Sequence, residues 1–196
     1  MAVNRLRFAA AQLGRKAGAR ERLACLLTVL DLPGAGWRVL DERTWRTGVA
    51  GPVTPWGGRA RAAGSVTAWR SFQDAAGRRW VWVQVMPLVS AQDALEALGG
   101  IGDRLLGNAR ATVKLVREAD VEVAPFAGAS AVWAHEQHTA GPGGEGVSLL
   151  LAGVVAVSVV VVCASGSPAW DWRAVSELAA RQADHLAAGE GSGAKP

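Results

Sequence analysis

The chain has 196 residues, of which 50% are hydrophobic and 19% charged, a balance that supports one buried core and excludes a disordered protein. Its formal net charge is +4, and residues 1–61 hold eleven basic against four acidic side chains. Residues 62–196 hold the other ten basic and thirteen acidic side chains, so this larger part is close to neutral. The basic character is therefore confined to the front of the chain, which argues against a uniformly basic nucleic-acid-binding domain.

Residues 1–18 are predicted to form a basic N-terminal arm, which could meet nucleic acid, anionic lipid or an acidic partner. The apolar segment after Arg7 is short and ends at further basic residues, whereas a secretory signal needs a longer apolar region and a small-residue cleavage site. Since the chain also shows no lipobox, we expect a cytoplasmic protein. Residues 19–187 are predicted to form a single α+β domain, and residues 188–196 a disordered tail.

The first half of the domain predicts one helix and three strands. Residues 19–30 carry leucines at helical spacing and predict a helix, and residues 37–45 predict a strand. Residues 47–64 are rich in Gly and Pro and long for a connection inside a compact domain, which indicates a functional or disordered loop. Residues 65–73 and 79–88 flank a turn and predict a hairpin, whose second strand has apolar side chains on both faces and should be covered on both sides.

The second half predicts two helices and further strands. Ser90 with Asp93 forms a capping box that indicates the start of a central helix. Residues 112–123 alternate between apolar and polar side chains and predict a strand with one wet face, and residues 130–139 predict another strand. Residues 170–187 carry an apolar stripe at helical spacing and predict a C-terminal helix.

The uncharged run of residues 147–164 has two interpretations. Its eighteen residues are just long enough for a transmembrane helix, but eight of them are Val, which favours strands, and Gly153 falls where a strand pair would turn or bulge. We therefore predict a buried hairpin. Together the elements predict an α+β fold: a largely antiparallel sheet of about six to seven strands, with an N-terminal, a central and a C-terminal helix packed on it.

Five side chains are the candidate binding residues. The loop contributes Trp56, Arg59 and Arg61, and both residue types are favoured at interface hot spots. Trp80 and Trp82 share one strand face, where they fill either the core or a pocket over the sheet. One tryptophan and two arginines are too few for a nucleic-acid platform, so nucleic acid is not an expected partner.

No motif for catalysis, cofactor binding or metal binding stands out. His135 and His138 are the nearest to a reactive cluster, but on a strand they face opposite sides, while Glu136 shares a face with His138. This is poor geometry for a shared metal, so no metal, cofactor or catalytic residue is predicted. Two cysteines are no disulfide framework, and whether Cys25 and Cys163 meet is left open.

Three segments carry a resemblance to a known group of domains. Leu-Leu-Thr-Val-Leu-Asp-Leu-Pro-Gly-Ala-Gly-Trp (26–37), the Val-rich hairpin and the closing helix with Arg-Gln-Ala-Asp-His-Leu (181–186) resemble actinobacterial PsbP-like, LpqN-type domains over about residues 23–187. That group includes lipoproteins and the external sensor domains of some bacterial kinases. The resemblance implies an antiparallel sheet flanked by helices, used for binding or sensing rather than catalysis. The missing lipobox and the lack of paired disulfides depart from its exported members and suggest an intracellular relative.

The leading hypothesis is a non-catalytic binding, sensor-like or assembly domain. Its expected partner is an unknown protein, a small apolar ligand or a second copy of the chain. One alternative is a membrane-associated protein that uses the Val-rich segment 147–164 or the basic arm. A second alternative, from another class, is a small hydrolase that uses His135 or His138.

Overall fold

Seven strands form one open sheet, and every neighbouring pair in it is antiparallel. This computed structural model describes residues 20–46, 66–103, 105–106, 114–141 and 144–192. The strand order is β1-β2-β3-β7-β6-β5-β4, so the last hairpin of the chain occupies the centre of the sheet. The predicted α+β class with a largely antiparallel sheet is confirmed. The strands are β1 (Arg38–Arg46), β2 (Val66–Gln73), β3 (Arg79–Pro87), β4 (Lys114–Asp120), β5 (Ala129–Gly141), β6 (Gly144–Val155) and β7 (Ser158–Gly166).

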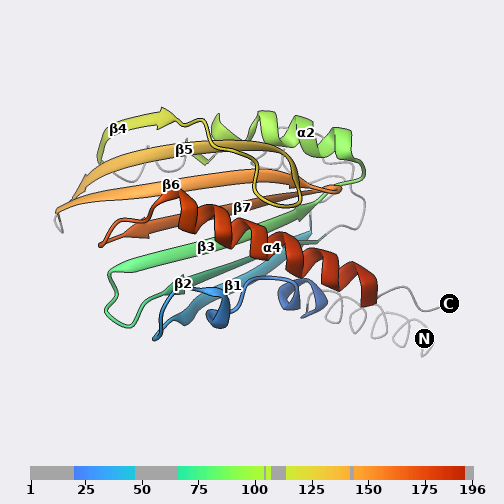
Figure 1. The fold of residues 1–196 in the computed structure, drawn as a ribbon, viewed down its shortest axis with the longest axis horizontal. Coiled ribbons are helices and arrows are strands. Elements are labelled where there is room, and N and C mark those ends of the chain that lie inside the picture. Colours follow the sequence, from blue (N-terminus) through green and yellow to red (C-terminus); the bar gives the residue numbers. More distant parts are fainter. Residues whose placement is uncertain (1–19, 47–65, 104, 107–113, 142–143, 193–196) are drawn as a thin grey trace, which may run out of the picture.

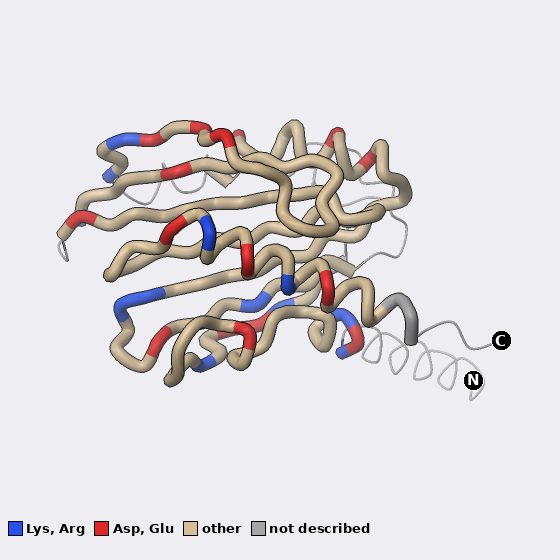
Figure 2. Tube along the Cα trace, viewed as in Figure 1, with Lys and Arg blue, Asp and Glu red and all other residues tan. Residues whose placement is uncertain are grey.

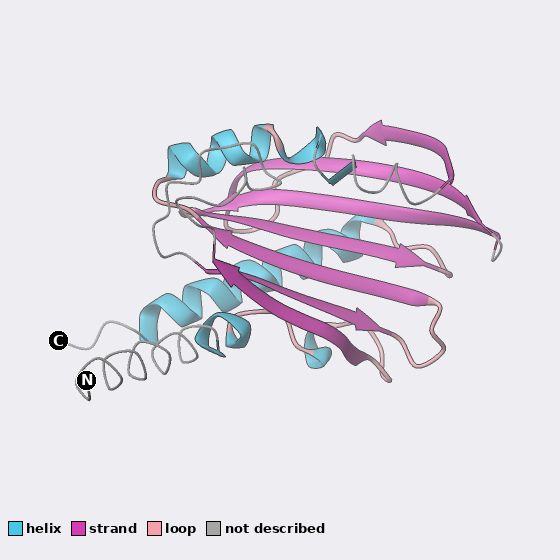
Figure 3. Ribbon diagram, turned by 180° about the vertical axis from the view of Figure 1, so that it is seen from behind, coloured by secondary structure: helices cyan, strands magenta, loops and turns pink. Residues whose placement is uncertain are grey.

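Helices cover both faces of the sheet. Helix α4 (Trp172–Ser192) crosses one face, together with the N-terminal segment, as Figure 1 shows. Helix α2 (Ala91–Gly99) lies on the opposite face near one end of the central strands, seen from behind in Figure 3. Strand β3 is therefore covered on both sides, as predicted: Val81 and Val83 belong to the α4-side core, and Met86 to the α2-side core.

The Val-rich run is a buried hairpin. Residues 147–164 make up most of β6 and β7, whose side chains are largely inaccessible to solvent. The expected turn position was wrong, because the chain reverses at Ala156 and Val157 instead of at Gly153. Gly153 lies inside β6, where an added Cβ would come within 2.5 Å of the Phe126 ring. Its function is thus to admit an aromatic ring over the sheet.

The N-terminal segment departs from the predicted helix. Of the described residues in the predicted helix 19–30, only residues 20–24 are α-helical. A single 3₁₀ turn, η1 (Val29–Asp31), follows them. Thr28 caps that turn, and Asp31 accepts hydrogen bonds from the backbone N–H and the hydroxyl of Thr28. This local capping box competes with continuation of the helix through Leu30. At the other end α4 continues to Ser192, past residue 188, where the tail was predicted to begin.

A bulge in β4 breaks the predicted alternation of residues 112–123. The register against β5 shifts between Leu115 and Arg117, so the faces exchange at Val116, which is 58% exposed. Glu118 was expected on the wet face, but its carboxylate faces His135 on β5. Among the described residues, no helix is both long and apolar enough to span a membrane, and the spanning reading of 147–164 is replaced by the two strands.

Candidate functional site

The predicted binding residues divide into two groups. Trp56, Arg59 and Arg61 lie outside the described residues. Trp80 and Trp82 do share the α2 side of β3, but beyond the end that α2 covers. Trp80 is 39% exposed, whereas Trp82 is partly buried against the α2-side core. The structure therefore brings the two β3 tryptophans to one surface with different degrees of exposure.

His135 and His138 belong to separate networks on opposite faces of β5. The buried His135 ring stacks on Trp133, and its Nδ1 lies 2.7 Å from Asp120 Oδ1. Its Nε2 lies 3.5 Å from Glu118 Oε2. The predicted alternation of faces is thus correct, and it separates His135 from the His138 network. A site that uses both imidazoles is not assembled.

The second network joins His138 to Glu136 on the α4 side. His138 Nε2 lies 2.5 Å from Glu136 Oε1, and Arg117 reaches both side chains. The hydrogen bond from His138, with the charges of His138 and Arg117, holds the pKa of Glu136 below its ordinary value, against the smaller opposing effect of burial. This arrangement fastens β4 to β5. In the described ranges, no cluster of three or more histidine, cysteine or acidic side chains has the geometry of a metal site.

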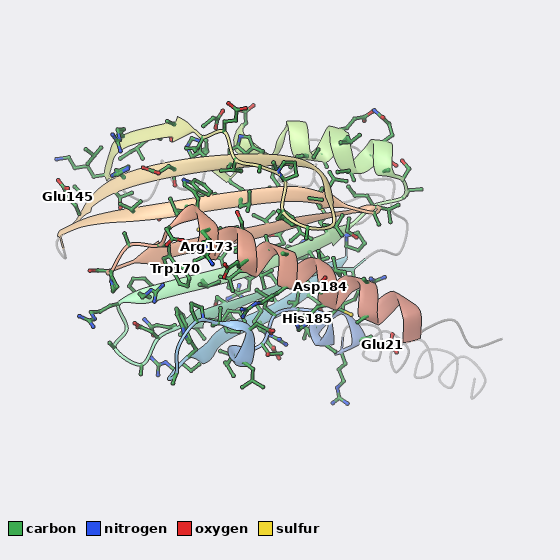
Figure 4. The ribbon with its side chains drawn as sticks, viewed as in Figure 1. Glu21, Glu145, Trp170, Arg173, Asp184 and His185 are labelled. Atoms are coloured by element: carbon green, nitrogen blue, oxygen red, sulfur yellow. The ribbon has the colours of Figure 1, made fainter. Side chains whose placement is uncertain are left out.

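A pocket of about 760 Å³ lies between the N-terminal segment and the C-terminal half of α4. We call it the α4 pocket, and Figure 4 labels three of its side chains, Glu21, Asp184 and His185. Its volume falls within the range of small-molecule sites. The described residues that line it are Glu21, Ala24, Cys25, Asp184, His185, Ala188 and Gly189.

Gln182 holds the two walls of the α4 pocket together. This fully buried side chain accepts a hydrogen bond from the backbone N–H of Leu27 at 2.9 Å and donates one to the backbone carbonyl of Cys25 at 2.7 Å. Both backbone groups belong to the stretch between the short helix and η1, where no helical partner exists for them. Leu26 and Leu27 are fully buried against α4 and supply the apolar part of the attachment.

Asp31 makes a second attachment below the pocket. It accepts hydrogen bonds from Thr28 and lies 3.2 Å from Nε2 of His185, a pocket residue. Arg181 also donates to the backbone carbonyl of Asp31. Partial burial raises the pKa of the Asp31 carboxyl, but the bonds from Thr28 and the nearby His185 together outweigh it and hold the pKa below 3.8. Asp31 therefore orients one imidazole of the pocket while it caps η1.

The lowered pKa of Asp31 predicts a specific pH dependence. Because its folded-state pKa lies below the unfolded value, the carboxylate stabilises the fold at neutral pH, and this contribution is lost as the pH falls through the folded-state pKa. Asp31→Asn should lower the free energy of unfolding at pH 7 and remove that share of the acid dependence. Urea unfolding between pH 7 and 3 measures it, with the exposed Asp103→Asn as control. Parallel curves for wild type and Asp31→Asn would contradict the assignment.

The two cysteines are free and lie in different environments. Cys163 is buried in β7, and burial raises the pKa of its thiol to about 12, so it behaves as an apolar side chain. Cys25 is partly exposed and faces the α4 pocket, where its Sγ would lie 2.7 Å from a Cβ added at Gly189. Gly189 thus leaves room for the thiol. No disulfide joins Cys25 to Cys163 in this structure.

The pocket combines an apolar body with acidic side chains. Ala24 and Ala188 contribute methyl groups, and Glu21 and Asp184 contribute carboxylates. Neither Lys nor Arg occurs among the described lining residues. Such a surface can hold an apolar group by burial and favours a positive charge at the acidic positions.

The sequence assigned none of these residues to a binding site: Cys25 was considered only for a disulfide, and Asp184 and His185 only within the 181–186 segment of the resemblance. The residues lie on two helical segments separated by about 160 positions, so no local pattern connects them. One signal was present: Gln182 interrupts the apolar stripe of the closing helix at a position that is fully buried. A buried amide requires partners, and these are the backbone groups of the N-terminal segment.

Comparison with known proteins supports the fold at low sequence identity. No protein-family model and no curated protein sequence matches the chain. Among solved structures, the extracellular domain of PknH from Mycobacterium tuberculosis is similar, with a TM-score of 0.57 and 16% identity. The match covers 86% of this chain and 96% of that domain, so the likeness extends over nearly the whole of both.

This comparison corrects one expectation and narrows another. The similar domain is extracellular, which contradicts the expected cytoplasmic location. The resemblance to kinase-sensor domains is supported at the level of fold. The narrower resemblance to PsbP-like, LpqN-type domains is not confirmed.

Proposed function

We propose that this chain is a non-catalytic, sensor-type binding domain whose ligand occupies the α4 pocket. The observation that carries the proposal is the pocket itself, whose walls come from opposite ends of the chain and are joined through buried Gln182. Ligand binding between these two walls would therefore affect how tightly the N-terminal segment is held against α4. The likeness in fold to an extracellular sensor domain supports the same class of function.

The lining indicates the chemistry of the ligand. We infer a small molecule with an apolar body and a cationic group, because Glu21 and Asp184 face it and neither Lys nor Arg is among the described lining residues. An anion would meet the carboxylates of Glu21 and Asp184. At a partly solvated site this difference corresponds to about tenfold in affinity. This proposal adds a cationic group to the small apolar ligand that the sequence analysis named as one possible partner.

Three probes with the same apolar chain test this chemistry: octylammonium, octanol and octanoate. Binding is measured by chemical-shift changes of backbone amides in ¹H–¹⁵N spectra of the full chain. We expect octylammonium to bind about tenfold more tightly than octanoate, with shifts centred on Cys25, His185 and Gly189. If all three probes shifted these residues equally, the pocket would still be the ligand site, but its preference for a cationic group would be refuted. No shifts there from any probe would remove the pocket assignment.

Ala188→Trp should abolish binding without unfolding the protein. Ala188 lines the pocket and is exposed, so an indole at this position fills the ligand volume and displaces no core side chain. We expect at least about a tenfold loss of octylammonium affinity and little change in the free energy of unfolding. The matched control is Ala187→Trp, at an exposed position of the same helix that is not among the lining residues. Equal binding by both variants would contradict the proposal.

The β3 tryptophans remain a second candidate contact surface. Trp80 is 39% exposed on a strand whose other tryptophan, Trp82, is packed against the α2-side core. We propose that this surface contacts a protein partner, and that Trp56, Arg59 and Arg61 of the 47–64 loop, which lie outside the described residues, form a further contact. Exposed aromatic side chains of this kind favour such contacts. Retention of partner binding by both Trp80→Ala and Arg59→Ala would remove this assignment.

A further inference from the structure

Strand β1 is an open edge of the sheet with exposed apolar side chains. It pairs with β2, and it is the first strand in the sheet order, so within the described part of the chain no strand pairs with its other side. Of the nine large hydrophobic side chains that are exposed in the described residues, three lie on this strand: Val39, Leu40 and Trp45, which are 44%, 54% and 37% exposed. Proteins normally cover such an edge, because its unpaired backbone groups and apolar side chains are a template for another strand.

The charges of β1 are arranged so that the strand complements itself. Asp41 and Arg43 lie on the same face, where the Arg43 Nε donates to Asp41 Oδ2 at 2.7 Å. Both side chains keep solvent exposure, 37% and 71%. Glu42, between them, points to the other face and is neutralised by Arg70 at 2.9 Å. Figure 2 shows that charges of both signs occur along this strand.

An antiparallel pair of β1 strands about a twofold axis at Glu42 places Asp41 of each copy opposite Arg43 of the other. Directly opposed side chains in an antiparallel pair lie on one face, and opposite charges there are favourable. The two existing Asp41–Arg43 pairs would then merge into one group of four alternating charges. The two Glu42 carboxylates meet near the axis, each already paired with its own Arg70.

We infer that β1 is a homodimer interface, in which two copies of the chain join their sheets edge to edge through this strand. The partner is a second copy because the complementarity is reciprocal, as an isologous twofold interface requires. The outer edge at β4 differs in its apolar side chains, since Val116 is the one large hydrophobic residue exposed on that strand, against three on β1. This interface is independent of the α4 pocket.

A charge-exchange experiment tests the inference. Asp41→Arg and Arg43→Asp are examined separately and as an equimolar mixture, with mass and dimer affinity read from native mass spectrometry and sedimentation velocity. Both positions are on the exposed edge, and circular dichroism checks that each variant is folded. In either single variant, like charges face each other across the axis, so we expect the dimer to weaken about a hundredfold. In the mixture each Arg faces an Asp, so a mixed dimer should form.

The controls make every outcome decisive. Lys114→Asp on the β4 edge should dimerise like the wild type, because that edge is outside the interface. A wild-type protein that stays monomeric at millimolar concentration overturns the inference. Single variants that dimerise normally overturn it as well. A mixture that remains monomeric although both of its members are folded also overturns it. Loss of the dimer in Lys114→Asp would move the interface to the opposite edge and equally overturn it.

Discussion

Replacing Gln182 by leucine is expected to lower the free energy of unfolding by about 3 kcal/mol, because two buried backbone groups lose their hydrogen-bond partner at once. The amide of Gln182 is fully buried and bonds to Leu27 N–H and to the Cys25 carbonyl. Leucine has a similar volume, so the loss reports on those two bonds and not on a cavity. Urea unfolding followed by tryptophan fluorescence measures it.

The same substitution should also disrupt the α4 pocket, because Cys25 and the residues before it are no longer held against α4. Binding of octylammonium is therefore expected to weaken in Gln182→Leu even at temperatures where the protein remains folded. The matched control is Gln92→Leu on α2, where an exposed glutamine bonds only to Glu96. Its stability should change by less than about 0.5 kcal/mol. Equal effects of the two substitutions would refute the role assigned to Gln182.

Trp170→Ala should destabilise the protein by about 3–5 kcal/mol, the usual range for removal of a buried tryptophan. The Trp170 ring is 6% exposed and lies 3.8 Å from the Arg79 guanidinium and 5.9 Å from the Trp37 ring. Its Nε1–H donates to the backbone carbonyl of Ser165 at 3.2 Å. The side chain thus joins the start of α4 to β3 and to the chain before β1, and thermal or urea unfolding reports the loss.

Trp80→Ala is the matched control for that substitution. Both changes remove an indole, but Trp80 is 39% exposed and buries less apolar area, so its loss of stability should be clearly smaller. Trp170→Phe separates the hydrogen bond to Ser165 from burial, since phenylalanine lacks the Nε1–H but retains an aromatic ring and most of the apolar contact. A loss in Trp170→Ala no larger than in Trp80→Ala would contradict the packing described for the α4 side.

The elements that could be predicted from the sequence are those with strong local patterns. The Val-rich run, the two-sided apolar strand β3 and the Ser90 cap of α2 each follow from side-chain period and capping chemistry. Their positions agree with the structure to within a few residues. The separation of His135 from His138 likewise follows from strand alternation alone, which is enough to argue against a shared histidine site.

The remaining features depend on contacts between distant residues. The turn at Ala156 instead of Gly153 depends on the Phe126 ring, which occupies the space beside the glycine. The bulge at Val116 places the residues after it on the opposite face from the one that strict alternation predicts. Such a register shift depends on the partner strand and leaves no pattern in the local sequence. The end of the first helix depends on Thr28 and Asp31, a capping box that the leucine pattern obscures. The α4 pocket joins segments from the two ends of the domain.

A fragment screen by ¹H–¹⁵N NMR on the full chain is the most direct test of the central claim that the α4 pocket is the ligand site. The probe is a library of small neutral, anionic and cationic fragments, each titrated into the wild type and into Ala188→Trp. Hits should be mainly cationic, should shift the amides of Cys25, Asp184, His185 and Gly189, and should lose these shifts in Ala188→Trp but not in Ala187→Trp. Hits that gather at other surfaces, or that are unaffected by Ala188→Trp, would contradict the account.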